Sequence, residues 1–130
     1  MKFPYTRYRG CFMPIVPLMV SRGEQRFLIE ALIDSGAASS IFDAQIADLL
    51  GIENIEDGIR CAFEGISGHP VVGYQHDVTL EVGENRFHAV PIVFTRDMPD
   101  NAVNILGEQE FFELFPITFD YQKKEIIIHL

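Results

Sequence analysis

The segment Asp34-Ser35-Gly36 places a carboxylate and a hydroxyl directly after an apolar run that ends in Leu32-Ile33. A carboxylate in such a place can act as a general base toward water, and a serine can act as a nucleophile when a base lies beside it. An isolated Asp-Ser-Gly is usually a surface turn, because Asp and Ser satisfy nearby backbone amides and Gly accepts positive φ. Here the apolar pairs Ala37-Ala38 and Ile41-Phe42 follow the turn, so we expect it to be packed inside the molecule.

The elements that must position this turn are mostly β-strands, because polar/apolar alternation and closely spaced turn signals recur along the chain. Residues 13–20 and 25–33 flank a polar loop that contains Gly23, which predicts a hairpin leading directly to Asp34. Similar patterns predict a second hairpin at residues 78–94 and a last one at residues 117–130. The final strand is too apolar to remain an open edge.

Two segments have helical spacing instead. Phe42, Ile46 and Leu50 share one helical face, and Ser40-x-x-Asp43 before them resembles a capping box. The second segment, residues 108–115, carries aromatic and apolar side chains that we expect in the core: Phe111, Phe112, Leu114 and Phe115. The pattern therefore predicts an all-β protein with one or two short helices.

Length and charge restrict the class of protein further. A chain of 130 residues, 48% of them hydrophobic, is expected to form one domain spanning residues 1–130. Its net charge of −9 opposes phosphate backbones and anionic lipids, so we expect neither nucleic acid nor membrane as a partner. The longest apolar run, residues 11–20, is too short to span a bilayer and is interrupted by Pro14 and Pro17, so no transmembrane segment is expected.

Cysteine and histidine usage predicts no metal or cofactor. Cys11 and Cys61 form no C-x-x-C pair, so we interpret them as buried small hydrophobic residues in a reducing compartment and expect a cytoplasmic protein. The four histidines form no H-E-x-x-H or other ligand cluster, and no glycine-rich phosphate loop is present. We therefore expect a protein without cofactor and without metal.

Three motifs in order resemble those of the retropepsin-like aspartic proteases, the single-lobe relatives of pepsin. Asp34-Ser35-Gly36-Ala37 is similar to the active-site motif of that family. Residues 64–69 (Glu-Gly-Ile-Ser-Gly-His) resemble the glycine-rich tip of its flap, and residues 103–107 (Val-Asn-Ile-Leu-Gly) resemble the element that packs beside the active-site loop. The resemblance covers most of the chain and implies a retropepsin-like closed β-barrel.

The resemblance also implies an aspartic endopeptidase. Activation of water on a peptide carbonyl by carboxylates requires two of them sharing a proton, a pairing for which the aspartic protease dyad is the standard example. The chain has a single Asp-Ser-Gly, so the resemblance implies an obligate homodimer in which Asp34 from each subunit meets at a two-fold axis. A polypeptide is then the implied substrate.

Roles for individual residues follow from the same resemblance. Asp34 activates water, Ser35 braces the two loops across the dimer, and Gly36 lets backbone approach the carboxylates. A serine nucleophile is disfavoured because the sequence lacks Gly-x-Ser-x-Gly. The implied substrate-binding residues are Leu32, Ala37, Ala38, Ile41, Gly65, Ile66, Ser67, Gly68, Ile105 and Leu106.

Departures from the family pattern leave alternatives open. The retroviral members usually carry an Asp and an Arg that form an ion pair, where this chain has Ala38 and Glu108. Ala37 stands where pepsins often have a hydroxyl, which predicts activity at mildly rather than strongly acidic pH. A catalytically silent dimerisation or peptide-binding module with the same fold is the main alternative, and a ligand-binding β-barrel is a weaker one because it leaves residues 103–107 unexplained.

Overall fold

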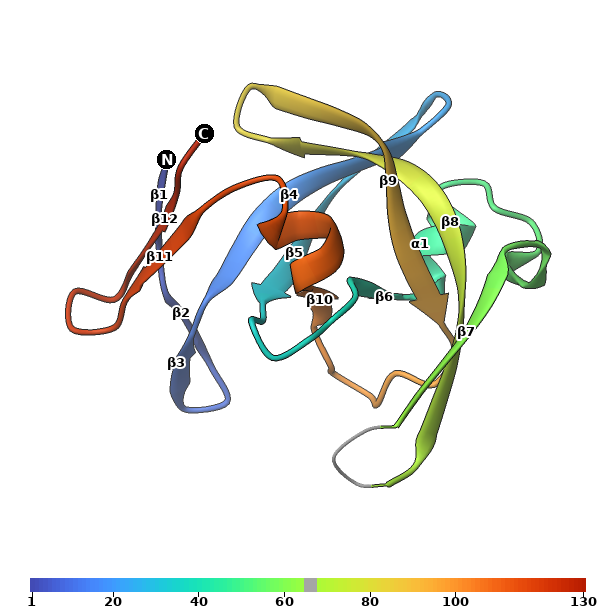
Figure 1. Cartoon of the computed structure of the whole chain (residues 1–130), viewed down its shortest axis with the longest axis horizontal. Helices are drawn as coiled ribbons and strands as arrows, with labels where there is room; N and C mark the ends of the chain where they lie inside the picture. The colour runs from blue at the N-terminus through green and yellow to red at the C-terminus, as the bar shows by residue number, and fades with distance from the viewer. Residues whose placement is uncertain (65–67) are drawn as a thin grey trace.

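The computed structural model describes residues 1–64 and 68–130 of the chain. Within these residues the protein is mainly β, and its largest sheet has seven strands in the order β4-β5-β10-β6-β9-β8-β7, with β4 also paired to β8 (Figure 1). The extra pairing closes much of the sheet into a ring, which confirms the predicted all-β fold. These strands are β4 (Ile15–Arg22), β5 (Gln25–Ile33), β6 (Ile41–Asp43), β7 (Ile59–Glu64), β8 (Pro70–Val82), β9 (Asn85–Thr95) and β10 (Asn104–Leu106).

The hairpin of β4 and β5 delivers the chain to Asp34, as the alternation predicted. Its strands pair antiparallel in a register that sets Leu18 opposite Ile29. Ile29, Ala31 and Ile33 are buried, whereas Leu28 on the opposite face of β5 is 68% exposed. Because side chains alternate between the two faces of a strand, burial of one face fixes the register and therefore the position at which β5 ends.

Strand β10 joins β5 from a distant part of the sequence. It runs parallel to β5, with Leu106 opposite Ile33, and antiparallel to β6, with Ile105 opposite Ile41. Strand β10 therefore lies between β5 and β6 in the sheet, although β5 and β6 are consecutive in the sequence. This insertion brings residues 103–107 beside Asp34, as their motif predicted.

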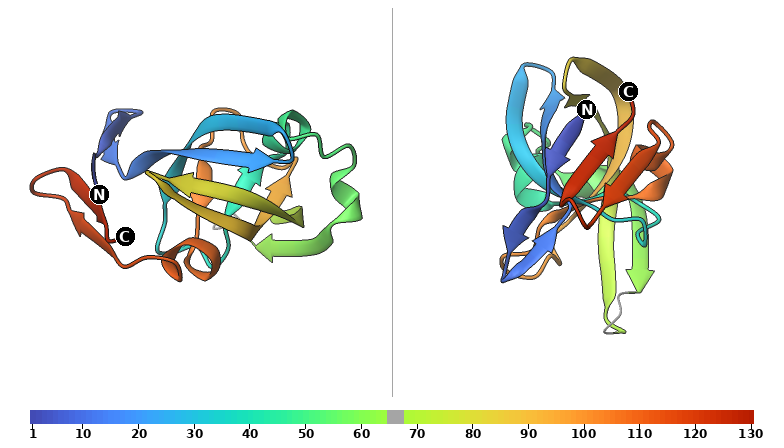
Figure 2. Two further views of the ribbon diagram at one scale, coloured as in Figure 1. Left: turned by 90° about the horizontal axis from the view of Figure 1, so that it is seen from above. Right: turned by 90° about the vertical axis from the view of Figure 1, so that its left-hand side faces the viewer.

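Strands β7 and β8 form a long antiparallel hairpin that projects from the body of the molecule (Figure 2). Its pairs run from Ile59 opposite Gln75 to Glu64 opposite Pro70. Gly68 adopts a φ of +76° just before β8, a backbone conformation that glycine accepts at little cost. The remaining residues of the predicted flap tip, Gly65, Ile66 and Ser67, lie outside the described residues.

The two ends of the chain meet in a smaller sheet at one side of the molecule (Figures 1 and 2). Strand β12 (Glu125–Ile128) lies between β1 (Lys2–Pro4) and β11 (Ile117–Asp120), and Ile126 and Ile128 are fully buried. The apolar final strand is thus covered on both edges, which confirms that it is not an open edge. Between β1 and the main sheet, β2 (Thr6–Tyr8) and β3 (Cys11–Met13) form a short separate hairpin.

The first helical segment forms where it was predicted, but its cap differs. Helix α1 spans Ala44–Leu49, and the Asp43 side chain accepts a hydrogen bond from the Gln45 amide at its start. The predicted capping box that begins at Ser40 is wrong, because Ser40 is fully buried and its hydroxyl accepts from the Gly107 amide, 2.9 Å away. A short 3₁₀ turn (Ile55–Asp57) follows α1.

The second helical segment is a single π-helical turn, Glu108–Phe112. Phe111 and Phe115 are buried, and their rings meet edge to face with centroids 5.2 Å apart. Phe112 is half-buried against the core, but Leu114 is 38% exposed, so the prediction that all four apolar residues anchor the core is wrong for Leu114. Leu114 lies two residues beyond the π turn and lines an open surface pocket with Arg86 and His88 instead of the core.

Both cysteines are free, but neither is buried as predicted. Cys11 is exposed on β3 and Cys61 is half-buried on β7. The reason is that these strands belong to two projecting hairpins with little core on either face. None of the helices in the described residues is long and apolar enough to cross a membrane.

A strained alanine in β9 gives a test of the fold. Ala89 adopts a φ of 55°, opposite the register shift between Val78 and Leu80. A left-handed conformation costs roughly 1–2 kcal/mol when a Cβ is present. Relief of that cost should exceed the extra unfolded-state entropy of glycine, about 0.5–1 kcal/mol. We expect Ala89→Gly to raise the free energy of unfolding by about 0.5 kcal/mol in urea titrations at fixed protein concentration.

The matched control is Ala62→Gly in β7, which should lower the free energy of unfolding by about 0.5–1 kcal/mol because the backbone there has ordinary extended geometry. Equal destabilisation by both substitutions would contradict the assigned strain.

Candidate active site

Asp34 lies at the point where β5 leaves the sheet. Its amide donates to the Leu106 carbonyl, 3.0 Å away on the neighbouring β10. Its side-chain Oδ1 accepts from the Gly36 amide at 2.8 Å, and the Ala37 amide donates to the Asp34 carbonyl at 3.2 Å. The carboxylate is therefore held through Oδ1 by its own turn.

The candidate active-site turn, residues 34–40, is less enclosed than the sequence predicted. Asp34 is half-buried, and Ser35 and Gly36 are exposed. The flanking apolar residues do pack into the molecule, since Ile33 and Phe42 are buried. The prediction that the turn is packed inside the molecule is therefore wrong for the single chain. The protein covers one side of the turn and leaves the other side exposed.

The covered side of the turn is bonded to the segment that follows β10. The Glu108 amide donates to the Ala37 carbonyl and the Gln109 amide donates to the Ala38 carbonyl, each at 2.9 Å. Gly107 permits this approach, because a Cβ on Gly107 would overlap the Ser39 carbonyl oxygen. Ala38 and Glu108 cannot form an ion pair. Each instead makes a backbone hydrogen bond to a residue of the other segment, Ala38 to Gln109 and Glu108 to Ala37.

A pocket of about 370 Å³ opens beside the turn. Four of the predicted site residues line it together: Gly36, Ala37, Ala38 and Ile41. The other lining residues are Ser39, Phe63, Glu64 and Val71, which the sequence reasoning did not assign to substrate binding. Phe63 and Val71 face each other across β7 and β8, so the pocket lies between the turn and the base of the projecting hairpin.

Four other predicted substrate-binding residues, Leu32, Gly68, Ile105 and Leu106, do not line this pocket. Leu32 and Ile105 are half-buried, paired across β5 and β10, and do not line the pocket. Leu106 is fully buried, so the prediction that its side chain forms a subsite wall is wrong in this chain. Leu106 contributes its backbone instead, through the carbonyl that holds Asp34. Gly68 lies two residues before β8, beyond the pocket lining.

A buried acid that the sequence reasoning missed lies under the same turn. Glu110 is 8% exposed, and its Oε2 accepts from the Ser40 amide at 2.9 Å. Burial raises the pKa of the Glu110 carboxyl, while hydrogen bonds from Ser40 and from its own backbone oppose that rise. No local signal indicates this role, because a glutamate between Gln109 and Phe111 matches an ordinary solvent-facing helical position.

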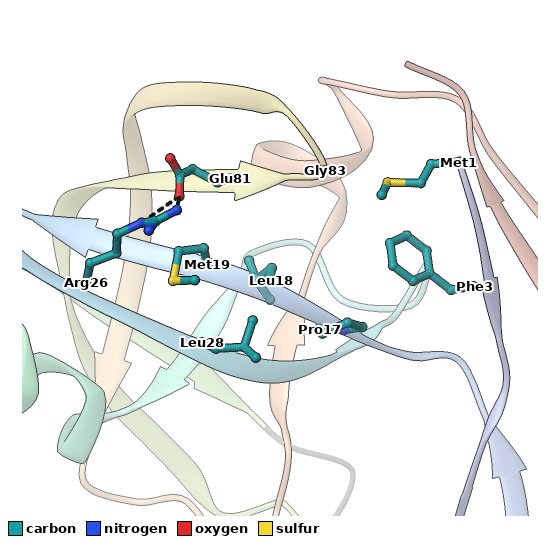
Figure 3. A pocket seen from close by; sticks show the side chains of 9 residues that line it. All are labelled: Met1, Phe3, Pro17, Leu18, Met19, Arg26, Leu28, Glu81 and Gly83. Carbon is teal, nitrogen blue, oxygen red and sulfur yellow. Dashed lines mark hydrogen bonds and ion pairs between the residues drawn. The ribbon is translucent and has the colours of Figure 1, made fainter.

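A second pocket, of about 230 Å³, lies away from Asp34 between β1 and the hairpin of β4 and β5 (Figure 3). Phe3 approaches it from β1, Met1 from the residue before that strand, and Leu28 from β5. Arg26 pairs with Glu81 at its rim, at 2.8 Å. It contains none of the residues predicted to act in catalysis or substrate binding.

Within the described residues, no group of three or more His, Cys, Asp or Glu side chains is arranged to hold a metal ion.

The closed sheet, the Asp-Ser-Gly turn at the end of a strand and the inserted β10 define a retropepsin-like single lobe. The profile of the aspartyl protease family matches residues 16–109, so the chain belongs to the aspartyl protease family. This range contains the active-site turn, the projecting hairpin and β10.

Solved structures agree on the fold. The retropepsin-like aspartic protease from Rickettsia conorii is 17% identical with a TM-score of 0.64, and the match covers 98% of this chain and 89% of that one. The EIAV protease, complexed with the inhibitor HBY-793, is 18% identical with a TM-score of 0.59, covering 84% of this chain and 94% of that one. A search of curated proteins finds no match.

The contact between Gly107 and the active-site turn can be tested by stability. In Gly107→Ala, the added Cβ would overlap the Ser39 carbonyl and lie 2.9 Å from the Ala37 carbonyl, so the turn must shift. We expect the free energy of unfolding to fall by about 2 kcal/mol or more, measured by urea denaturation.

Gly23→Ala is the control, because Gly23 has a φ of +59° but open space around it. That substitution should cost only the left-handed backbone, about 1 kcal/mol. A cost for Gly107→Ala no larger than for Gly23→Ala would show that the turn is not held in close contact.

Proposed function

We propose that this protein is an aspartic endopeptidase that acts as a homodimer, with residues 1–130 forming one protomer. The observation that carries the proposal is the position of Asp34. Its half-buried carboxylate stands at the open side of a turn whose other side is bonded to the fold, next to an apolar pocket. Membership of the aspartyl protease family supports the same chemistry.

A second copy is needed because one chain supplies only one of the two carboxyl groups that the reaction requires. The chain has one Asp-Ser-Gly, and carboxylate-activated hydrolysis of a peptide requires two carboxyl groups sharing one proton. A two-fold axis next to the exposed Ser35 and Gly36 would bring Asp34 of a second copy to the first. Ser35 would then brace the two turns, and Gly36 would allow their backbones to approach.

In the proposed reaction, the ionised member of the Asp34 pair takes a proton from water. The water oxygen attacks the scissile carbonyl carbon, and the protonated member gives its proton to the carbonyl oxygen, which forms a neutral tetrahedral diol. The C–N bond then breaks as the protonated member gives its proton to the amine nitrogen, while the ionised member takes a proton from one hydroxyl of the diol, which becomes the new carboxyl group. The amine leaves, and the Asp34 pair again shares one proton. No covalent link between protein and substrate forms.

The pocket suggests how a peptide would be held. An extended peptide could add as a strand between the turn and the projecting hairpin of β7 and β8. Ala37, Ala38 and Ile41 on one side and Phe63 and Val71 on the other would receive an apolar side chain. We further propose that Gly65, Ile66, Ser67 and Gly68 bind the substrate.

We consider the terminal sheet a candidate for the dimer contact, and its own pairing limits how a second copy could join it. Strand β12 already pairs with β1 and β11 of its own chain, so its backbone edges are occupied. A second copy could pair only with an outer strand of this sheet or pack against its face.

We also propose a cytoplasmic location, supported by the two free cysteines.

Subunit mixing tests the shared site directly. Asp34→Asn should abolish cleavage of a diverse unstructured peptide library across mildly acidic to neutral pH. Titrating excess Asp34→Asn subunits into the wild-type protein should also suppress its activity, because mixed dimers would hold a single carboxylate. At a fixed amount of wild-type protein, activity at equilibrium should fall in proportion to the wild-type fraction of all subunits. Wild-type homodimers are the square of that fraction among all dimers, but the number of dimers grows as mutant is added.

Asp48→Asn is the matched control, since Asp48 is an exposed acid on α1. It should neither lose activity nor suppress the wild type. Unchanged wild-type activity in excess Asp34→Asn would contradict a shared site. Absence of cleavage by a stable wild-type dimer would instead favour a silent peptide-binding or dimerisation module.

A further inference from the structure

We propose that Glu110 is a positioning residue for Asp34: its side chain holds the far end of the active-site turn so that the turn keeps one geometry. The kinetic part of this inference rests on the proposed function. The structural part concerns the described chain alone.

The turn is held at both ends and in its middle by one short segment. At its start, Asp34 is bonded to Leu106, and in its middle Ala37 and Ala38 are bonded to the amides of Glu108 and Gln109. All of these contacts join backbone to backbone. Main-chain groups therefore fix the first part of the turn whatever the side chains are.

The far end of the turn is held differently, because side chains supply its contacts. The Ser40 hydroxyl accepts from the Gly107 amide, and the Ser40 amide donates to the Glu110 carboxylate, both at 2.9 Å. Ser40 is fully buried and Glu110 nearly so. A buried amide without a partner costs about 1–3 kcal/mol, so this end of the turn depends on the Glu110 carboxylate.

The π-helical turn explains how an acid reaches this place. The Glu113 amide donates to the Glu108 carbonyl at 3.2 Å, five residues back, which widens the turn by one residue. Phe111 stays fully buried in the core while Glu110, one residue earlier, points to Ser40. Such single π turns often occur at functional sites, where they change the direction of one side chain.

The charged groups around Glu110 come from two elements. Glu113 on its own segment raises the pKa of Glu110 further, after the larger effect of burial. From β9, Arg86 and His88 line the same cavity of about 370 Å³ as Glu110 and Glu113. Hydrogen bonds from Ser40 act in the opposite direction and favour the ionised carboxylate. Titration of Glu110 should therefore be visible at Ser40.

The first experiment is a pH titration of the wild-type protein by ¹H–¹⁵N NMR. The Ser40 amide proton should shift with a midpoint above about 4.3, the value for an unperturbed glutamate. That shift should vanish in Glu110→Gln, whose amide oxygen can still accept from Ser40. Glu113→Gln, which removes an equal charge from the same segment, should retain the shift with a lower midpoint.

The second experiment compares kinetics on one cleaved peptide. Glu110→Leu should lower kcat by about tenfold or more while KM changes by about twofold at most, because misplacing the turn affects the reacting carboxylate more than the pocket. Glu110→Gln should restore kcat to within about threefold of the wild type, and Glu113→Gln should match the wild type. A purely structural role would lower the amount of folded protein and leave kcat per folded dimer unchanged.

The outcomes separate this inference from the proposed function. A Ser40 amide that does not titrate, or that titrates equally in Glu110→Gln, overturns the contact even if the protein cleaves peptides. A wild-type kcat in folded Glu110→Leu overturns the positioning role. A protein that cleaves nothing while Ser40 titrates as expected overturns the proposed function and with it the kinetic role, but leaves the contact established.

Discussion

The structure depends on one constraint: the backbone of the turn that leaves β5 at Asp34 must find hydrogen-bond partners outside its own strand. Buried amides and carbonyls are costly when unpaired, and a turn between two strands cannot satisfy them alone. The segment Leu106–Glu110 supplies the partners. Because it reaches the turn only through β10, the insertion of β10 between β5 and β6 is a requirement of the site as well as a feature of the sheet.

Satisfying one side of the turn leaves the other side open. Ser35 and Gly36 are exposed, and Asp34 is half-buried next to an apolar pocket. A rigid inner side and an uncovered outer side are what a shared site between two copies requires, since catalytic groups must hold their geometry while their partner arrives from solvent. The projecting hairpin of β7 and β8 borders the same pocket, to which it contributes Phe63 and Val71.

The chain ends form a small sheet of their own that packs against the common core. The Met1 amino group donates to the Ile128 carbonyl at 2.8 Å, and β1 and β11 cover both edges of β12. Ile126 and Ile128 are buried in the same hydrophobic cluster as Leu106 and Phe111, which lie in the segment that holds the turn. The terminal sheet and the turn therefore share core partners, so their contributions to stability are coupled.

Local patterns in the sequence determined the elements and pointed to one candidate carboxylate. Alternation in residues 25–33 fixed which face of β5 is buried, and the motif at Asp34 singled out the carboxylate that we propose as catalytic, because both depend on neighbours in the chain. Tertiary structure alone decided the roles of Ser40, Glu110 and Leu106. Ser40 and Glu110 are 70 residues apart, and a capping serine, a solvent-facing glutamate and a subsite leucine were all reasonable from local context. Only the insertion of β10 brings these residues to the turn, and contacts between such distant segments leave no periodic signal in a single sequence.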